Sequence, residues 1–158
     1  MRKHFAHLLH EEMSKNRDIY LITGDLGYGL WDQIRDTYPD RFFNVGSSEM
    51  AMMGMAVGLA MDGKVPFVYS ITPFAIYRPF EMIRNYLDHE RIPVNIVGGG
   101  RDRDYGYLGF SHWADDDQVL MRGFENIKML RPSDESELNQ MFGSIVHNRF
   151  PAYLNLRK

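Results

Sequence analysis

Three side chains suited to proton transfer lie beside glycine-containing turns in this sequence. Asp25 lies within Gly24–Gly29, where the glycine spacing is the reverse of the dinucleotide fingerprint G-x-G-x-x-G. Glu49 follows a Gly-Ser-Ser run, and His112 lies near the end of a long stretch rich in glycine and tyrosine. Carboxylates and imidazoles in such places can act as general acids and bases. Each also has a structural explanation: a turn residue, a carboxylate that favours a helix N-terminus, and an exposed loop histidine.

Aromatic side chains suited to a flat ligand lie further along the chain. Phe74 and Tyr77 follow Pro73. They could form the wall of a binding site for a ring, or they could be core residues of the next helix. Arg78 and Glu81 beside them could be an ordinary surface pair. The residue types therefore leave both a ligand wall and a packing role open.

A few groups of charged side chains in this sequence could bind anions or metal ions. Arg101 could bind an anionic substrate, although Asp102 beside it offsets part of the positive charge. The N-terminal histidines are three residues apart, a spacing that does not converge on one metal ion from a helix. The Asp115–Asp117 run could hold Mg²⁺, but a helix start uses the same residues. We therefore predict a substrate contact at Arg101 and no metal site.

Composition excludes several other kinds of protein. The chain of 158 residues has no cysteine, which excludes disulfides, thiolate nucleophiles and cysteine metal sites. Lys and Arg number 18 against 21 Asp and Glu, so the positive excess typical of nucleic-acid binders is missing. An apolar content of 44% is typical of a globular domain. Apolar runs fall short of the roughly 20 residues that cross a bilayer, and we expect a cytoplasmic protein.

Apolar stretches with the length of strands alternate with helical stretches along the whole chain, and these elements must position the candidates. We expect strands at 18–23, 41–45, 64–71, 92–97, 127–130 and 152–156. We expect helices at 2–15, 30–38, 48–61, 76–89, 115–124 and 133–148, the last with Ser133 as its cap. The alternation predicts a three-layer α/β/α fold with a mostly parallel six-stranded sheet. Such sheets bind ligands outside the carboxyl ends of their strands, where the turns described above fall.

The helix expected at 48–61 has an unusual composition. No residue between Glu49 and Asp62 is charged, and Gly54 and Gly58 lie four residues apart. A helix that is apolar all round is buried on all sides. In a chain of this length, we expect one face of this helix to contact a second chain. Glu49 would then lie at the edge of a buried interface, where ionisable groups are often functional.

A long motif extends over residues 39–67. Residues 39–49 read PDRFFNVGSSE, and they are followed by Gly58-Leu59-Ala60 and by Gly63-Lys64-Val65-Pro66-Phe67. Together they resemble the pyrimidine-binding module of transketolase-like enzymes, the family of transketolase and deoxyxylulose-phosphate synthase. The Asp25-Leu26-Gly27 turn, the loop that ends in Ser111-His112 and the 151–156 strand resemble other family segments. The resemblance implies that residues 1–158 form a single pyrimidine-binding domain.

The resemblance also implies a role for each candidate. Glu49 would be a catalytic residue that contacts the aminopyrimidine ring of thiamine diphosphate. The cofactor would be lined by further side chains: Asp25 and Phe74 or Tyr77. His112 would bind substrate oxygens and assist proton transfer, and we place Arg101 beside it as a second substrate-binding residue.

The family's diphosphate-binding G-D-G motif is not present in these 158 residues. The resemblance therefore implies a separate subunit that holds the diphosphate and Mg²⁺, in an assembly of two copies of each chain. The reaction would be two-carbon ketol or acyl transfer, or a related carboligation or decarboxylation, on a sugar or keto acid. Two alternatives remain open: a non-catalytic regulatory or scaffold relative, and a free-standing flavodoxin-like binding domain.

Overall fold

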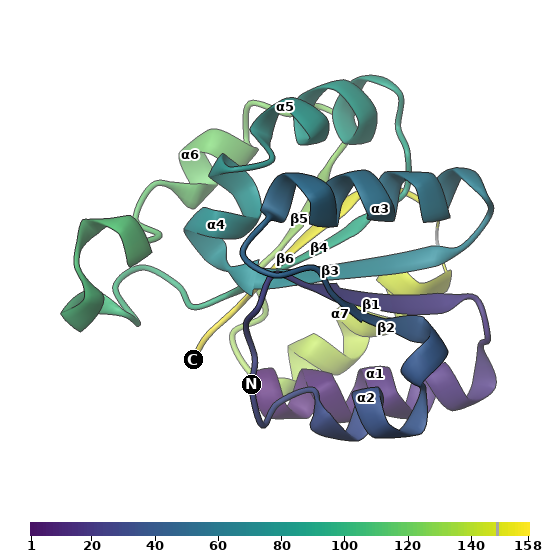
Figure 1. Cartoon of the computed structure of the whole chain (residues 1–158). Helices are drawn as coiled ribbons and strands as arrows, with labels where there is room; N and C mark the ends of the chain where they lie inside the picture. Colours follow the sequence, from purple (N-terminus) through teal and green to yellow (C-terminus); the bar gives the residue numbers. More distant parts are fainter. Residues whose placement is uncertain (148) are drawn as a thin grey trace.

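A computed structural model describes residues 1–147 and 149–158 as a three-layer α/β/α sandwich (Figure 1). Within these residues, six strands form one sheet in the order β2-β1-β3-β4-β6-β5, and every pair is parallel. The strands are β1 (Ile19–Thr23), β2 (Phe42–Asn44), β3 (Val65–Ile71), β4 (Asn95–Gly99), β5 (Lys128–Leu130) and β6 (Ala152–Leu156). The predicted fold class is confirmed.

Helices cover both faces of the sheet (Figure 1). One face carries α1 (Arg2–Lys15), α2 (Asp32–Thr37) and α7 (Glu135–His147). The other carries α3 (Glu49–Met61), α4 (Thr72–Tyr77), α5 (Phe80–Met82) and α6 (Asp117–Met121). A 3₁₀ turn at Pro39–Arg41 leads into β2. The loop after β4 contains two more 3₁₀ turns, Gly106–Leu108 and Phe110–His112.

The sheet separates two hydrophobic cores. On the α1 side, the ring of Phe5 packs against Trp31, Phe67 and Phe142, with ring centroids 6.2, 6.1 and 5.7 Å apart. On the α3 side, the core contains methionines and aliphatic residues of α3 and of the segment that follows β3. The two cores pack against opposite faces of the sheet and hold its strands in place. The carboxyl edge of the sheet is thereby a fixed base on which a site can form.

Helix α3 is buried on only one side within the chain. Its Met52 and Met53 are fully buried against the sheet, whereas Met50, Met55 and Met61 are 44, 39 and 71% exposed. The expected burial on all sides is therefore not achieved by one chain alone. The exposed methionines form the apolar face that we expect to contact a second chain.

The segment after β3 differs most from the prediction of one helix over residues 76–89. Helix α4 begins earlier, at Thr72, with a proline in its first turn. It ends before Pro79, whose ring and missing N–H group do not fit inside a helix. The short helix α5 follows, and a π-helical turn over Ile83–His89 completes the segment.

The start of α7 also differs from the prediction. The side chain of Asp134, not of Ser133, caps this helix, because its Oδ1 accepts a hydrogen bond of 2.9 Å from the backbone N–H of Glu137. Glu137 in turn accepts a 2.7 Å bond from the backbone N–H of Ser133. The expected last residue of this helix, Asn148, lies outside the described residues.

In the described part of the chain, no helix combines the length and the apolar character that crossing a membrane requires.

Candidate functional site

Glu49 lies at the carboxyl edge of the sheet with its carboxylate almost completely buried. It is the first residue of α3, and only 2% of its surface is exposed. Ser70 of β3 donates a 3.3 Å hydrogen bond to its Oε1. Gly24, just after β1, is packed so close that a Cβ built there would lie 3.4 Å from Oε1. The neighbouring strands β1 and β3 therefore fix the position of this carboxylate.

Arg78 is the main partner of this carboxylate. Its Nη1 lies 2.8 Å from both Oε1 and Oε2 of Glu49. The guanidinium carbon lies 3.7 Å from the centroid of the Phe74 ring, in a cation–π arrangement. The surface pair with Glu81 suggested by the sequence is replaced by this buried contact. Sequence reasoning missed Arg78, although its position directly after Tyr77 placed it in the right segment.

Phe74 connects this pair to His112. The two rings are edge to face, with centroids 4.9 Å apart and planes at 67°. His112 ends a 3₁₀ turn, and its Nδ1 lies 3.0 Å from the hydroxyl of Ser111. The structure therefore brings together three of the predicted residues: the Arg78 guanidinium joins Glu49 to Phe74, and the Phe74 ring packs against His112.

Asp25 lies at the same edge, one residue beyond the glycine that contacts Glu49. Its backbone is in the left-handed region at φ 60°, and its N–H donates a 2.9 Å hydrogen bond to Oδ1 of Asn44. The Asp25 carboxylate accepts hydrogen bonds from the Tyr28 hydroxyl and, at 3.2 Å, from the Asn44 amide. These bonds, led by that from Tyr28, hold the pKa of Asp25 below its usual range.

Tyr77 is placed differently from Phe74. Its side chain is 38% exposed. Burial of its hydroxyl region and the neighbouring Asp116 carboxylate raise the pKa of Tyr77 well above its usual value. Of the two aromatic candidates, Phe74 is the one in contact with the Glu49–Arg78 pair.

Arg101 is buried away from this group. Its Nε lies 2.8 Å from Oδ1 of Asn155, and its Nη2 donates to the carbonyl of Pro132 at 2.7 Å. Burial lowers the pKa of Arg101. The prediction that Arg101 contacts substrate finds no support in this arrangement. The guanidinium ties the loop after β4 to β6 instead.

A buried polar network continues from Asn155. Its amide donates to Oγ1 of Thr72 at 3.0 Å and to the hydroxyl of Tyr153, also at 3.0 Å. The Tyr153 hydroxyl donates to Asp117 at 2.7 Å, and Arg131 binds both oxygens of Asp117 at 2.7 and 2.9 Å. This network joins the start of α4 to β6 and α6. It thereby supports Phe74 and the loop that carries His112.

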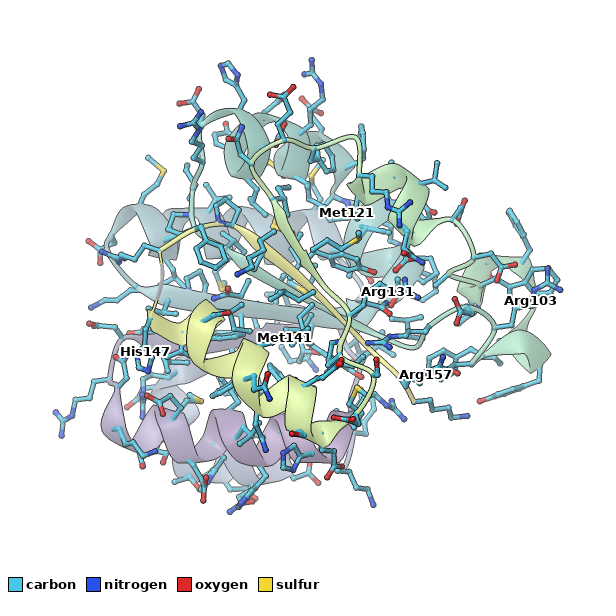
Figure 2. The ribbon with its side chains drawn as sticks, turned by 180° about the vertical axis from the view of Figure 1, so that it is seen from behind. Arg103, Met121, Arg131, Met141, His147 and Arg157 are labelled. Carbon is cyan, nitrogen blue, oxygen red and sulfur yellow. The ribbon has the colours of Figure 1, made fainter. Side chains whose placement is uncertain are left out.

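The loop after β4 projects beyond the sheet. Seen from behind, Arg103 stands on this projection, while Arg131 and Arg157 lie nearer its base (Figure 2). Arg103 pairs with Asp115 at 2.8 Å. Asp115 and Asp117, two of the possible Mg²⁺ ligands, are thus both held by arginines. Among residues 1–147 and 149–158, no three His, Asp or Glu side chains are grouped so that they could hold a metal ion.

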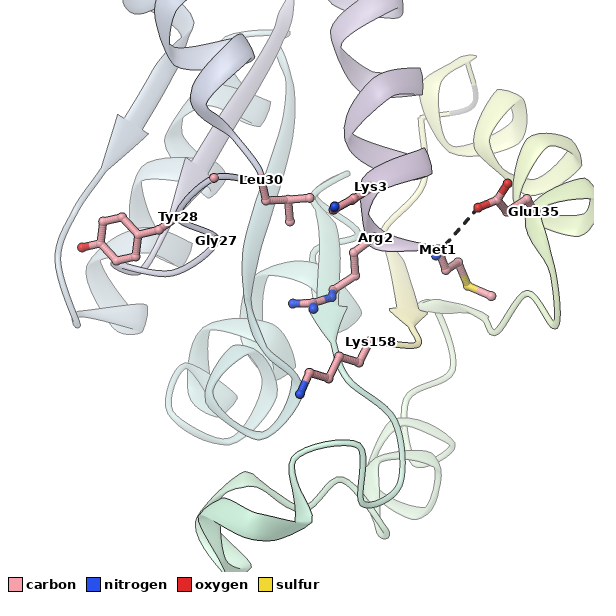
Figure 3. Close-up of a pocket in the computed structure, with 9 residues that line it drawn as sticks. Met1, Arg2, Lys3, Gly27, Tyr28, Leu30, Glu135 and Lys158 are labelled. Atoms are coloured by element: carbon pink, nitrogen blue, oxygen red, sulfur yellow. Dashed lines mark ion pairs between the residues drawn. The ribbon is translucent and has the colours of Figure 1, made fainter.

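A cavity of about 670 Å³ opens beside the Gly27–Tyr28 turn (Figure 3). Arg2, Lys3 and Lys158 line it, with Glu135 as the only acidic lining residue in the described part of the chain. Arg2 also donates a 2.8 Å hydrogen bond to the hydroxyl of Tyr105, at the base of the projecting loop. The excess of cations suits an anionic ligand.

Comparisons with known proteins identify relatives of the chain. A putative transketolase C-terminal section from Methanocaldococcus jannaschii is 32% identical over 157 residues, which are 99% of this chain and 50% of that protein. One subunit of an apulose-4-phosphate transketolase from Actinobacillus succinogenes is 34% identical over 119 residues, 75% of this chain and 38% of that protein. The chain thus spans about half or less of the length of these relatives.

Solved structures give the same result for the fold. A split-gene transketolase, described as an inactive β4 tetramer, is 29% identical with a TM-score of 0.86, over 99% of this chain and 50% of that one. The transketolase of Campylobacter jejuni is 19% identical with a TM-score of 0.87, over 99% of this chain and 25% of that one. The family model for the pyrimidine-binding domain of transketolase matches residues 1–158. The chain therefore belongs to the transketolase pyrimidine-binding domain family.

Proposed function

We propose that this chain is the pyrimidine-binding part of a two-subunit, thiamine-diphosphate-dependent enzyme of the transketolase type. The observation that carries the proposal is the buried Glu49 carboxylate at the carboxyl edge of the sheet, in a group with Phe74 and His112. Family relatives from Actinobacillus succinogenes and a Clostridium species bear names as transketolase subunits, which supports a division of the enzyme between two chains.

The residues at this edge fit the pyrimidine half of the cofactor. An aminopyrimidine ring needs a hydrogen-bond acceptor in a dry environment and an apolar surface against its face. The buried carboxylate of Glu49 and the ring of Phe74 provide these, with Asp25 at the border and Tyr77 as the second aromatic. Among the described residues, no three His, Asp or Glu side chains are grouped so that they could hold a metal ion. The proposal therefore assigns the diphosphate and Mg²⁺ to the partner subunit.

The cofactor, when bound, supplies a nucleophilic carbon and an electron sink for ketol or acyl transfer. The residues of this chain would position the cofactor ring and transfer protons. Glu49 would hold a proton at the pyrimidine ring nitrogen, and its burial strengthens that hydrogen bond. His112, whose Nδ1 faces Ser111, would present Nε2 to substrate oxygens and move a proton there.

The proposed assembly contains two copies of each subunit, with active sites at the interfaces, and is cytoplasmic. Its reaction would be two-carbon ketol or acyl transfer, or a related carboligation or decarboxylation, on a sugar or keto acid. The chain would be active only together with its partner. Family membership leaves a non-catalytic scaffold as the alternative that an experiment must separate from this enzyme.

The test is the variant Glu49→Gln in the complex with the diphosphate-binding subunit. A neutral amide keeps the shape of the side chain but cannot hold the proton, so we expect turnover to fall about 100-fold or more. Assembly, measured by size-exclusion chromatography with light scattering, should persist. Glu81→Gln on the exposed α5 is the matched control. A complex of wild-type chains that binds the cofactor without any turnover would support the scaffold instead.

A further inference from the structure

The guanidinium of Arg78 contacts both the buried carboxylate and the aromatic ring of the candidate site. Its Nη1 lies 2.8 Å from both oxygens of Glu49, and its carbon lies 3.7 Å from the centre of the Phe74 ring. A flat, positively charged group therefore already lies against the aromatic face and donates to the buried carboxylate.

An aminopyrimidine ring would need the same two contacts. It is also planar, it would donate to Glu49, and it would lie against Phe74. The guanidinium and the ring cannot both lie at 3.7 Å over one face of Phe74 while both bind the carboxylate. We infer that Arg78 is a competitor for the pyrimidine site, and that the cofactor ring binds by displacing its guanidinium from Glu49 and Phe74. This inference rests on the proposed function.

The surroundings of the pair favour such an exchange. The side chain of Arg78 is 45% exposed, whereas that of Glu49 is 1% exposed. Because part of the Arg78 side chain already faces solvent, its guanidinium can swing into water on a long and flexible stem. The carboxylate cannot follow it. Ser70 would still donate its 3.3 Å hydrogen bond to Oε1, but the buried charge would lose its positive partner, which is strongly unfavourable. The incoming ring supplies the replacement donor, so that Glu49 stays paired before and after the exchange.

Removal of Arg78 should therefore have opposite effects on folding and on binding. Without its guanidinium, the chain carries a buried carboxylate that keeps the Ser70 hydrogen bond but has no countercharge, so it is less stable. The cofactor would then bind without a competitor and would also relieve the unpaired charge, so its affinity should rise. A residue with a purely structural role would lower stability without improving affinity.

The experiment compares Arg78→Met with wild type, both assembled with the diphosphate-binding subunit. Isothermal titration with thiamine diphosphate and Mg²⁺ measures the dissociation constant, and thermal unfolding of the full chain measures stability. We expect Arg78→Met to bind about tenfold more tightly and to melt at a lower temperature. Arg78→Lys, which keeps the charge but lacks the planar fork, should fall between the two. The control is Arg84→Met, because Arg84 is exposed and its Nη1 bonds to Asn85 at 2.9 Å.

Equal or weaker binding by Arg78→Met, with wild-type binding intact, overturns the inference and leaves the proposed function standing. If Arg78→Met does not fold, Arg78→Lys decides by the same measurement. Failure of every variant and of wild type to bind thiamine diphosphate in the complex would overturn the proposed function, and this inference with it.

Discussion

Two carboxylates at the same edge of the sheet, Glu49 and Asp25, are held in different ways. Glu49 is 2% exposed and is bound by a guanidinium, so its position depends on the core. Asp25 lies in a partly exposed turn and is bound by neutral donors from Tyr28 and Asn44. The first arrangement suits a group that must meet a ligand in a dry place, and the second suits a group that stays ionised in contact with water.

The Tyr28 hydroxyl should control the ionisation of Asp25. In Tyr28→Phe the carboxylate loses its strongest donor, so the pKa of Asp25 should rise toward its usual range; NMR titration of the side-chain carboxyl measures it. The ionised form favours the folded state at pH values above the unfolded pKa. Because the folded pKa is the lower one, this stabilisation is lost as the pH falls through it. An unchanged titration in Tyr28→Phe, with Tyr20→Phe as control, would show that Asn44 alone holds the carboxylate.

At this scale, the sequence predicted the types of residue but not every partner. Glu49, Phe74 and His112 lie in segments that follow β2, β3 and β4, which a parallel sheet must bring to one edge, so they could be found from the pattern. The Arg78 contact depends on how α4 ends before Pro79, which a pattern of residue types does not specify. The sequence suggested that Arg101 binds an anion because only its neighbours in the loop could be judged. Its actual acceptors, Asn155 in β6 and Pro132, are distant in sequence.

Among the elements, β4 approaches its neighbours unusually closely. A Cβ at Gly99 would lie 2.5 Å from the Tyr69 hydroxyl, and one at Gly98 would lie 2.6 Å from Oγ1 of Thr72. Only glycine lets the strand end lie this close to β3 and to the start of α4. Gly98 thus lets Thr72, the first residue of α4, pack directly on β4, and Gly99 leaves room for the Tyr69 hydroxyl.

A pair of glycine substitutions tests this packing with opposite signs. Gly99→Ala should destabilise the chain by about 1–3 kcal/mol, because the new methyl group collides with Tyr69. Gly143→Ala, within α7, meets no atom within 4 Å and should stabilise the chain by about 0.5–1 kcal/mol, since alanine favours a helix. Urea unfolding followed by circular dichroism measures both. A Gly99→Ala chain as stable as wild type would contradict this account of the β4 end.

The elements themselves were largely predictable. The periodicity gave the bounds of the first helix and of the last strand as the structure has them, because both have clear apolar patterns and sharp ends. The segment after β3 was predicted poorly, because a proline inside an apolar run splits a helix in a way that periodicity alone does not reveal. The cap of α7 was misplaced by one residue, since Ser133 and Asp134 are both suitable caps.

At the scale of the whole molecule, the exposed methionine face of α3 is an apolar surface that the chain itself does not cover. Met50, Met55 and Met61 lie on this face, and Gly58 leaves room there for another backbone. A helix side that carries several exposed methionines and no charged residue between Glu49 and Asp62 suits coverage by a partner. The face adjoins Glu49, so a chain docked on it would also help to close the site.

Met55→Glu should separate assembly from folding. A charge on this face should weaken association with the proposed partner subunit at least about tenfold, while the melting temperature of the isolated chain stays near that of wild type. Light scattering after size-exclusion chromatography measures the first, and calorimetry the second. Gln140→Glu, on the exposed side of α7, adds the same charge elsewhere. Normal assembly of Met55→Glu would place the interface on another surface.

The base of the projecting loop has a consequence for how the family can diversify. An isolated antiparallel bridge joins Asp102 to Ala114, and the N–H of Ala114 donates to the carbonyl of Asp102 at 2.8 Å. The two ends of the excursion are therefore fastened to each other before the chain rejoins the sheet. Asp104 and Tyr105 are bound to Lys158 and Arg2, so residues 106–113 are the part of the loop whose length and composition can change with least effect on the strands. A change in this part of the loop alters the surroundings of His112 and leaves the position of Glu49 at the start of α3 unchanged.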